Sequence, residues 1–188
     1  EPCYVFHPMN AYDDGAHVVV DVCRHPTMFA KSVEGPNDGG APTLDRWMID
    51  SAAGKVREER LDDRGQEFPR VNETLLMSRH RYGYAVEIVE SATAFDSARL
   101  LKHDLTAGTS EHHEFGTGAQ PSEFVFVPAA GATSEDDGYL MGYVYDATRD
   151  SSDFVVLDAH DIAAKPIAAV RLPQRVPFGF HGNWVADA

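Results

Sequence analysis

Four ionisable residues return at nearly equal intervals along this chain, and they are of the types that bind or support metal ions. They are His7, Glu67, Glu123 and His181, which are separated by 60, 56 and 58 residues. Each lies in a short apolar and aromatic stretch that contains proline: YVFHP, QEFPRVN, PSEFVFVP and RVPFGFHGNWV. Such stretches are typical of β-strands. The spacing therefore predicts four strands that each present one ionisable side chain.

Two histidines and two carboxylates at one place would suit a divalent transition metal. Neutral imidazole is a good ligand for iron, copper or zinc. The carboxylates have two open roles, because they can bind the metal directly or accept a hydrogen bond from the outer ring nitrogen of a ligand histidine. Two histidines are too few for a complete site, so we expect further ligands from outside this chain. The alternative is four separate polar groups on unrelated strands, and their common register argues against it.

The elements that must position these residues are predicted to be β-strands as well. Runs rich in β-branched and aromatic residues, bounded by Gly, Pro, Asp or Ser, indicate strands at residues 17–23, 45–50, 82–89, 99–104, 138–146 and 153–158. No long segment has a helical period, so any helix is expected to be short and to lie in a loop such as residues 26–32. The fold class is therefore all-β.

An internal repeat indicates how the strands are arranged. Asp50, Asp104 and Asp158 are 54 residues apart, and each ends a strand that is followed by a turn and another strand. A period of this size with four short strands per repeat is typical of a β-propeller. The first strand of each blade lines the central axis, so the four ionisable residues would converge there.

The length of the chain corresponds to only part of such a ring. At this period, 188 residues supply about three and a half blades, whereas propellers close with roughly 4 to 8. A ring that stops there would have bare edge strands, which soluble proteins avoid. We therefore expect residues 1–188 to be the C-terminal part of a single propeller domain, whose N-terminal blades are absent from this chain.

Composition narrows the class of protein further. The hydrophobic fraction of 43% and charged fraction of 24% are those of an ordinary globular protein. The net charge of −14 argues against nucleic acid as a partner. No apolar run approaches the roughly 18 residues of a membrane span, and no signal peptide opens the chain, so a cytoplasmic location is expected. Cys3 and Cys23 form neither a zinc spacing nor a disulfide framework.

Several other residues attract attention but receive no metal role. Six further histidines lie outside the predicted inner strands: His17, His25, His80, His103, His112 and His113. His160 follows a strand end and is expected to be a turn residue. Five aromatic residues could line an apolar substrate tunnel or pack in the core, and the sequence does not decide between the two: Tyr12, Tyr143, Phe178, Phe180 and Trp184.

The stretches that carry the four residues, taken in order, resemble the C-terminal part of the carotenoid cleavage oxygenases. This family includes apocarotenoid-cleaving and stilbene-cleaving enzymes and the retinoid isomerase. The resemblance runs from His7 to Val185 and rests on FHPMNAYDDG, EFPRVNE, PSEFVFVP with SEDDGYLMGYVYD, and VVLDAHDIAAKPIAAVRLPQRVPFGFHGNWV. It implies a seven-bladed propeller with a dome of helices and loops over one face.

The resemblance also implies a metal centre and its ligands. In the family, non-haem Fe(II) is held by four histidines and no carboxylate. His7 matches the third of these ligands and His181 the fourth, while Glu67 and Glu123 match two of the three glutamates that support them. The first two histidines and the remaining glutamate would belong to the absent part.

The implied activity is oxidative cleavage of a conjugated carbon–carbon double bond in a carotenoid, apocarotenoid or stilbene. The partners would be a lipophilic or aromatic alkene, O2 and the missing N-terminal blades, in the same protein or a separate chain. Peripheral membrane contact, to collect lipophilic substrate, is also open. The alternative is a non-catalytic propeller fragment or interaction module. The complete set of His, Glu, Glu and His favours the enzyme, because an interaction module has no need of metal chemistry.

Overall fold

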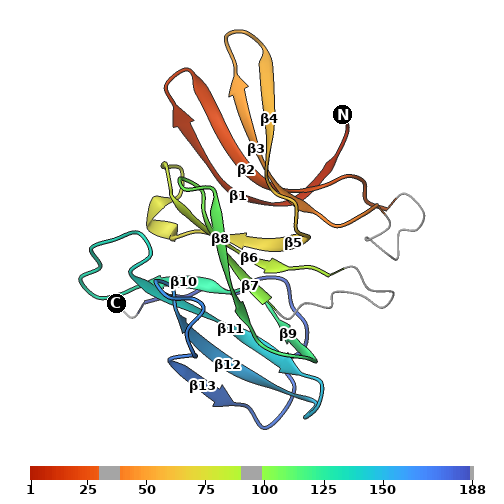
Figure 1. The fold of residues 1–188 in the computed structure, drawn as a ribbon, viewed down its shortest axis with the longest axis vertical. Helices are drawn as coiled ribbons and strands as arrows, with labels where there is room; N and C mark the ends of the chain where they lie inside the picture. Colours follow the sequence, from red (N-terminus) through yellow and green to blue (C-terminus); the bar gives the residue numbers. More distant parts are fainter. Residues whose placement is uncertain (30–38, 90–98, 187–188) are drawn as a thin grey trace.

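The computed structural model describes residues 1–29, 39–89 and 99–186, which form three antiparallel sheets (Figure 1). Blade 1 consists of β1 (Tyr4–Asp14), β2 (His17–His25), β3 (Thr43–Asp50) and β4 (Lys55–Asp62). Blade 2 consists of β5 (Gln66–Arg70), β6 (Tyr82–Glu87), β7 (Arg99–Asp104) and β8 (Thr109–Glu114). Blade 3 consists of β10 (Val125–Pro128), β11 (Gly138–Asp146), β12 (Ser151–Asp158) and β13 (Ala168–Arg171), and a short strand β9 (Ala119–Pro121) also pairs with β11.

Each blade is a meander in which consecutive strands are neighbours, and the inner strands are β1, β5 and β10. The expected all-β propeller blades are therefore confirmed. The predicted strands at residues 99–104 and 138–146 have the observed bounds, and the other four differ by about two residues at one end, as expected for strand boundaries.

The three repeated aspartates are turn residues, as predicted. Asp50 Oδ1 accepts a hydrogen bond from the Ala53 amide at 2.8 Å. Asp104 and Asp158 likewise accept hydrogen bonds from backbone amides of the turns that follow them. A short carboxylate that binds its own backbone two or three residues on stabilises a tight turn. The 54-residue period therefore marks the same hairpin in each of the three blades.

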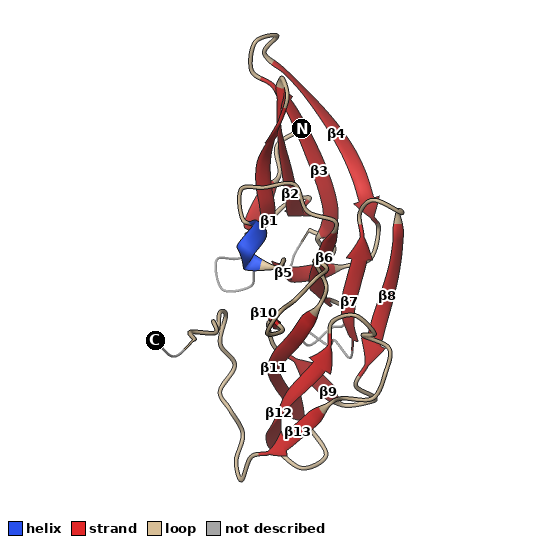
Figure 2. Ribbon diagram, turned by 90° about the vertical axis from the view of Figure 1, so that its left-hand side faces the viewer, coloured by secondary structure: helices blue, strands red, loops and turns tan. Residues whose placement is uncertain are grey.

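One expectation from the sequence is wrong. The C-terminal segment, residues 175–185, forms no strand; Figure 2 shows it running along one side of the sheets. In the loop named as a possible place for a short helix, residues 26–29 contain bends, and residues 30–32 lie outside the described residues. The helical turn that the described residues do contain is η1 (Glu73–Leu75), capped by the side chain of Asn72.

The core lies between neighbouring blades. The larger cluster joins blades 2 and 3: Tyr84, Val86, Leu100, Phe124, Phe126, Leu140, Val144, Val155, Leu157, Ala159 and Ile162. A smaller one, with Met9, Leu44 and Val71, joins blades 1 and 2. Because apolar burial is the main favourable term in folding, these clusters fix how the blades sit against each other.

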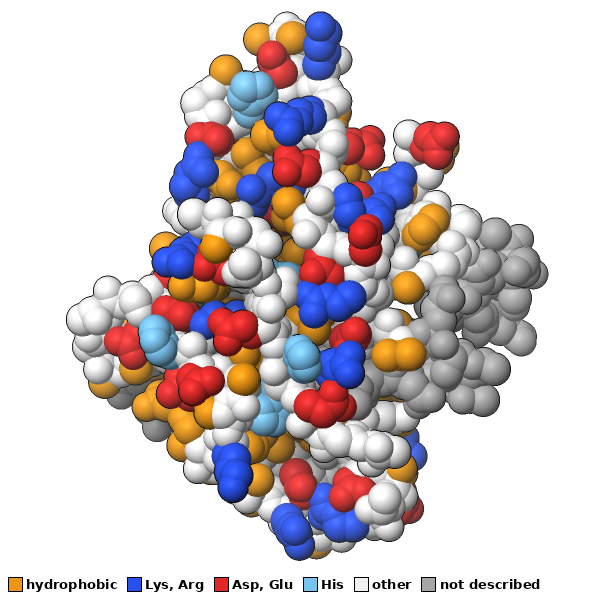
Figure 3. All heavy atoms as spheres, in the orientation of Figure 1, with side chains coloured by type: hydrophobic (Ala, Val, Ile, Leu, Met, Phe, Trp, Pro, Cys, Tyr) orange, Lys and Arg blue, Asp and Glu red, His pale blue; other side chains and the backbone are white. Residues whose placement is uncertain are grey.

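The surface view in Figure 3 shows acidic and basic side chains interspersed over the face drawn. The acidic excess of the chain is thus not gathered into one patch on this face. In the described ranges, no helix is long and apolar enough to cross a membrane.

Candidate metal centre

His7 and Glu67 meet where the inner strands of blades 1 and 2 lie side by side. His7 Nδ1 is 2.6 Å from Glu67 Oε2. Because an ionised carboxylate only accepts hydrogen bonds, this contact assigns the hydrogen to Nδ1 and leaves a lone pair on Nε2. The hydrogen bond to Glu67 raises the pKa of His7, against the opposing effect of burial.

Glu67 itself is buried and receives three donors. Burial acts to raise its pKa, but hydrogen bonds from His25, His7 and the Phe68 amide together lower it below the ordinary value. Both oxygens are engaged, since Oε1 is 2.6 Å from His25 Nε2 and Oε2 also accepts from the Phe68 amide at 2.8 Å. Glu67 is therefore an ionised hydrogen-bond acceptor.

Glu123 accepts a hydrogen bond from His181, as Glu67 does from His7. It lies between β9 and β10, and its side chain is 5% exposed. Oε1 is 3.1 Å from His181 Nδ1, and Oε2 accepts from the Gly182 amide at 3.0 Å. His181, like His7, is therefore left with a lone pair on Nε2.

The two imidazoles converge although they are far apart in the sequence. His7 Nε2 and His181 Nε2 are 3.2 Å apart, and the ring planes are inclined by 78°. Two lone pairs facing each other at this distance repel unless a proton or a cation lies between them. Two nitrogens bound to one metal ion at about 2.1 Å and at an angle of roughly 90–110° would be about 3.0–3.4 Å apart. The pair therefore fits two ligands of one metal ion.

The geometry thus brings together all four residues singled out by the spacing. Of the two roles left open for the carboxylates, it favours that of hydrogen-bond acceptor for the outer ring nitrogens. Among residues 1–29, 39–89 and 99–186, no group of three or more His, Cys, Asp or Glu side chains is arranged to hold a metal ion. The structure brings together two imidazoles, His7 and His181, and a supply of further ligands from outside this chain stays a prediction.

Two further residues, His25 and Arg70, belong to the centre and were not predicted from the sequence. His25 is off the inner strands, as expected, but its buried ring reaches Glu67 from β2. Arg70 pairs with Glu123 from the end of β5. The register of β1 with β2 shifts twice near His7, and that of β5 with β6 shifts between Glu67 and Arg70. Such bulges leave no clear mark in the sequence, so neither contact could be predicted.

The remaining histidines of the strands do not join the centre. His80 contacts Asn10, His103 contacts Gln66 and Ser110, and His113 contacts the Ile162 carbonyl. His17 and His112 are exposed, as is the turn residue His160. That these histidines have no metal role stays a prediction.

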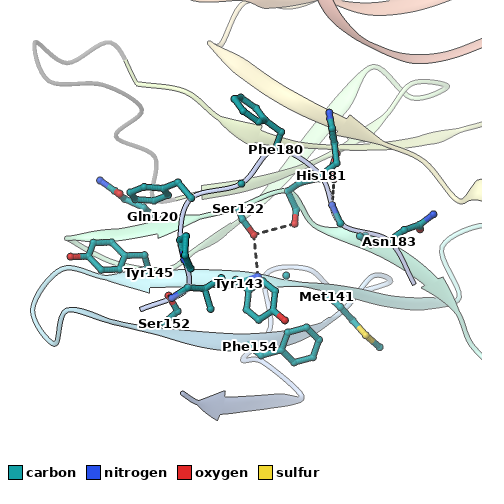
Figure 4. Close-up of a pocket in the computed structure, with 18 of the residues that line it drawn as sticks. Gln120, Ser122, Met141, Tyr143, Tyr145, Ser152, Phe154, Phe180, His181 and Asn183 are labelled. Atoms are coloured by element: carbon teal, nitrogen blue, oxygen red, sulfur yellow. Dashed lines mark hydrogen bonds and ion pairs between the residues drawn. The ribbon is translucent and has the colours of Figure 1, made fainter. Parts of the chain in front are cut away.

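A mainly apolar pocket of about 280 Å³ lies beside His181, between the C-terminal segment and the β11 and β12 face of blade 3 (Figure 4). Tyr143, Phe178, Phe180 and Trp184 line it and are exposed, so they do not pack in the buried core, and a role in a substrate tunnel stays a prediction. Tyr12 instead is buried and packs edge-on against His80. A second cavity of about 530 Å³ is open to both imidazoles.

Comparison of the sequence and fold with known proteins identifies the family of this chain. The family described as retinal pigment epithelial membrane protein, RPE65, matches residues 1–186. The chain belongs to this family, that of the carotenoid cleavage oxygenases. A carotenoid cleavage oxygenase of Mycobacterium tuberculosis is 47% identical over 98% of the chain. An apocarotenoid-15,15'-oxygenase of Synechocystis is 31% identical over 96% of it, and an isoeugenol monooxygenase of Pseudomonas nitroreducens 29% identical over 97%.

Solved carotenoid cleavage oxygenase structures agree with the fold. The cobalt-substituted Synechocystis ACO superposes with a TM-score of 0.89 at 30% identity over 98% of this chain. The match takes up 40% of that structure, and the chain spans 38% of the length of the Mycobacterium relative. The expectation of a partial propeller is therefore confirmed.

Proposed function

We propose that this chain is the C-terminal part of an Fe(II)-dependent oxygenase that cleaves a conjugated carbon–carbon double bond with O2. The observation that carries the proposal is the pair of Nε2 atoms 3.2 Å apart, each on an imidazole whose Nδ1 is held by a buried carboxylate. The names of the relatives support the reaction class. The first two iron-binding histidines would come from the N-terminal blades, in the same protein or a separate chain.

Iron, when bound, would supply the activation of O2. His7 and His181 would hold it through Nε2, and Glu67 and Glu123 would fix the tautomer and direction of the rings. These glutamates have no free oxygen for use as general bases. The overall reaction is balanced without another electron donor, because the alkene carbons and both oxygen atoms become two carbonyl groups.

The substrate is proposed to be a carotenoid, an apocarotenoid or a stilbene-type phenol. All three are elongated, conjugated and largely apolar. The aromatic pocket beside His181 has walls of matching character, and such a pocket would exclude water from the alkene. Delivery of a lipophilic substrate from a membrane surface is part of the same proposal.

Iron content of the purified complete protein tests the proposal. We expect iron near one per protein in the wild type, none in His181→Ala, and about 10–100-fold weaker iron binding in Glu123→Gln. His112→Ala, which changes an exposed histidine outside the centre, is the control. Cleavage of an apocarotenoid, measured as carbonyl products, should fall with the iron content. Full iron content in His181→Ala would overturn the assignment of His181 as a ligand, whereas a wild-type protein without iron would favour a non-catalytic interaction module.

A further inference from the structure

Arg70 contacts three separate parts of the chain from the end of β5. Nη1 donates to Glu73 Oε1 at 2.7 Å, and Nη2 donates to Glu123 Oε2 at 3.1 Å and to the Gly182 carbonyl. Nε is also 3.1 Å from Glu123 Oε1, but without the alignment of a hydrogen bond. With its side chain 20% exposed, Arg70 is largely withdrawn from water; its contacts with Glu73 and Glu123 are partly buried, whereas the contact with the Gly182 carbonyl is exposed.

Gly182 is held through both of its backbone groups. Its N–H donates to Glu123 Oε2 at 3.0 Å, and its carbonyl accepts from Arg70. In a sheet, a neighbouring strand would satisfy both groups. Here the Arg70–Glu123 ion pair takes the place of that strand, at the residue next to His181. This explains how a segment without sheet pairing can still present an imidazole in a defined direction.

The backbone of β5 allows one short strand to serve both imidazoles. Residues three apart on a regular strand point to opposite faces, yet Glu67 binds His7 and Arg70 binds the partner of His181. The register shift between Glu67 and Arg70 is a bulge, and Phe68 within it has φ of 56°, a left-handed conformation that is uncommon for a bulky residue. The bulge brings both side chains to the centre.

We propose that Arg70 is a positioning residue that fixes His181 by binding Glu123 and the Gly182 carbonyl at once. Nη1 is anchored on Glu73 while Nη2, in the same rigid plane, donates to both acceptors, whereas an ammonium group has a single nitrogen and no second anchor. The inference deepens the proposed function, because it concerns presentation of a metal ligand. It does not require a bound metal, so the two can fail separately.

Fluorescence of Trp184 reports on the C-terminal segment, since it lies two residues from Gly182. The test uses the complete protein with every tryptophan except Trp184 replaced by phenylalanine, including Trp47, the second tryptophan of this chain. We expect Arg70→Gln to increase acrylamide quenching of Trp184 and to accelerate hydrogen exchange of the Gly182 amide by roughly 10–100-fold. Arg70→Lys should behave like Arg70→Gln, because the charge alone does not bridge the two acceptors.

Two comparisons separate positioning from general stability. Arg64→Gln removes another arginine–carboxylate pair, with Asp62, and should leave Trp184 quenching at the background value. A double-mutant cycle of Arg70→Gln with Glu123→Gln should be non-additive, because both changes release the same segment. Unchanged quenching in Arg70→Gln, or full retention of the wild-type signal by Arg70→Lys, would overturn the proposal. Circular dichroism verifies that each variant is folded.

Discussion

Glu67 and Glu123 hold equivalent imidazoles but have different neighbours. Glu67 lies between two histidines, His7 and His25, and receives one backbone amide. Glu123 receives one histidine, one backbone amide and the guanidinium of Arg70. A fixed cation offsets the charge of Glu123, while Glu67 keeps its negative charge next to His7. The two imidazoles therefore experience different electrostatic surroundings.

Replacing His25 with phenylalanine should destabilise the protein. Glu67 Oε1 would lose its 2.6 Å donor while staying buried, and an unsatisfied buried acceptor costs about 1–3 kcal/mol. The measurement is urea unfolding of the variant and the wild type at neutral pH. His17→Gln, at the exposed start of β2, should stay within about 0.5 kcal/mol of the wild type. Equal stability of the two variants would show that His25 does not support Glu67.

At the scale of single residues, much of the candidate metal centre could be predicted from the sequence. His7, Glu67, Glu123 and His181 could be grouped because blade periodicity returns the inner strand at a regular interval. Three features could not be predicted: the histidine tautomers, the roles of Glu67 and Glu123, and the contact of His25. They depend on atomic positions to within a few tenths of an ångström. Bulges in the strands and packing of the core set these positions, and neither can be read from the pattern of residue types.

Close packing of β11 supports the position of Glu123. A Cβ added at Gly142 would lie 2.5 Å from the ring of Phe124, which directly follows Glu123 and is buried in the core. The absence of a side chain at Gly142 is what lets this ring lie flat against the strand. The element that carries the carboxylate is thus positioned by a contact on its other side.

Gly142→Ala should therefore lower the free energy of unfolding by about 1–3 kcal/mol, because the Phe124 ring must move. The displacement should also loosen Glu123 from His181, so under the proposed function iron binding by the complete protein should weaken. Gly179→Ala is a matched control, since an added Cβ there meets no atom within 4 Å. If both variants unfold at the same urea concentration, the packing argument is wrong.

The strands of the blades were predictable because their apolar runs and turn aspartates repeat together. The C-terminal segment has a similar composition, with alternating aromatic and small residues, and was wrongly expected to be a strand. Composition indicates that a segment can be extended. Whether it becomes a strand depends on a neighbour with free hydrogen-bonding groups, which is a property of the whole arrangement.

Blades 2 and 3 are joined by a buried ion pair as well as by their apolar cluster. Lys102 Nζ on β7 is 2.8 Å from Asp136 Oδ2, in the loop before β11, and donates to the His160 carbonyl at 3.2 Å. Burial acts to raise the pKa of Asp136, but its contacts with Lys102 lower it below the ordinary value. The pair therefore stays charged at neutral pH and ties the two blades together.

Lys102→Met should destabilise the protein by about 3–5 kcal/mol, since Asp136 would remain buried without its partner. Arg57→Met removes an exposed ion pair on β4 and should cost less than about 1 kcal/mol. Thermal unfolding followed by calorimetry measures both changes. A small effect of Lys102→Met would mean that the apolar cluster alone holds these blades.

Stability should also fall in mild acid through His103. Burial lowers the pKa of His103 to about 4, from 6.5 in an exposed position. Between these values the unfolded chain binds more protons than the folded chain, so stability rises with pH. The contribution is complete above pH 6.5 and is lost as the pH falls through 4, on the order of 3 kcal/mol.

Urea unfolding between pH 4 and pH 7 measures this dependence. His103→Gln should show a shallower fall in stability over the range, whereas His112→Gln, at an exposed position, should keep the wild-type slope. If the free energy of unfolding falls with pH equally in the wild type and both variants, groups other than His103 cause the acid sensitivity.

The meeting of His7 with His181 joins residues 174 positions apart. Under the proposed function, an ion bound by both closes nearly the entire chain into a loop, and a cross-link of that span removes unfolded-state entropy equivalent to roughly 5 kcal/mol. Withdrawal of iron would then increase the population of open molecules, which proteases cleave. Under the same proposal, iron-free protein is expected to be cleaved by an added protease faster than iron-loaded protein.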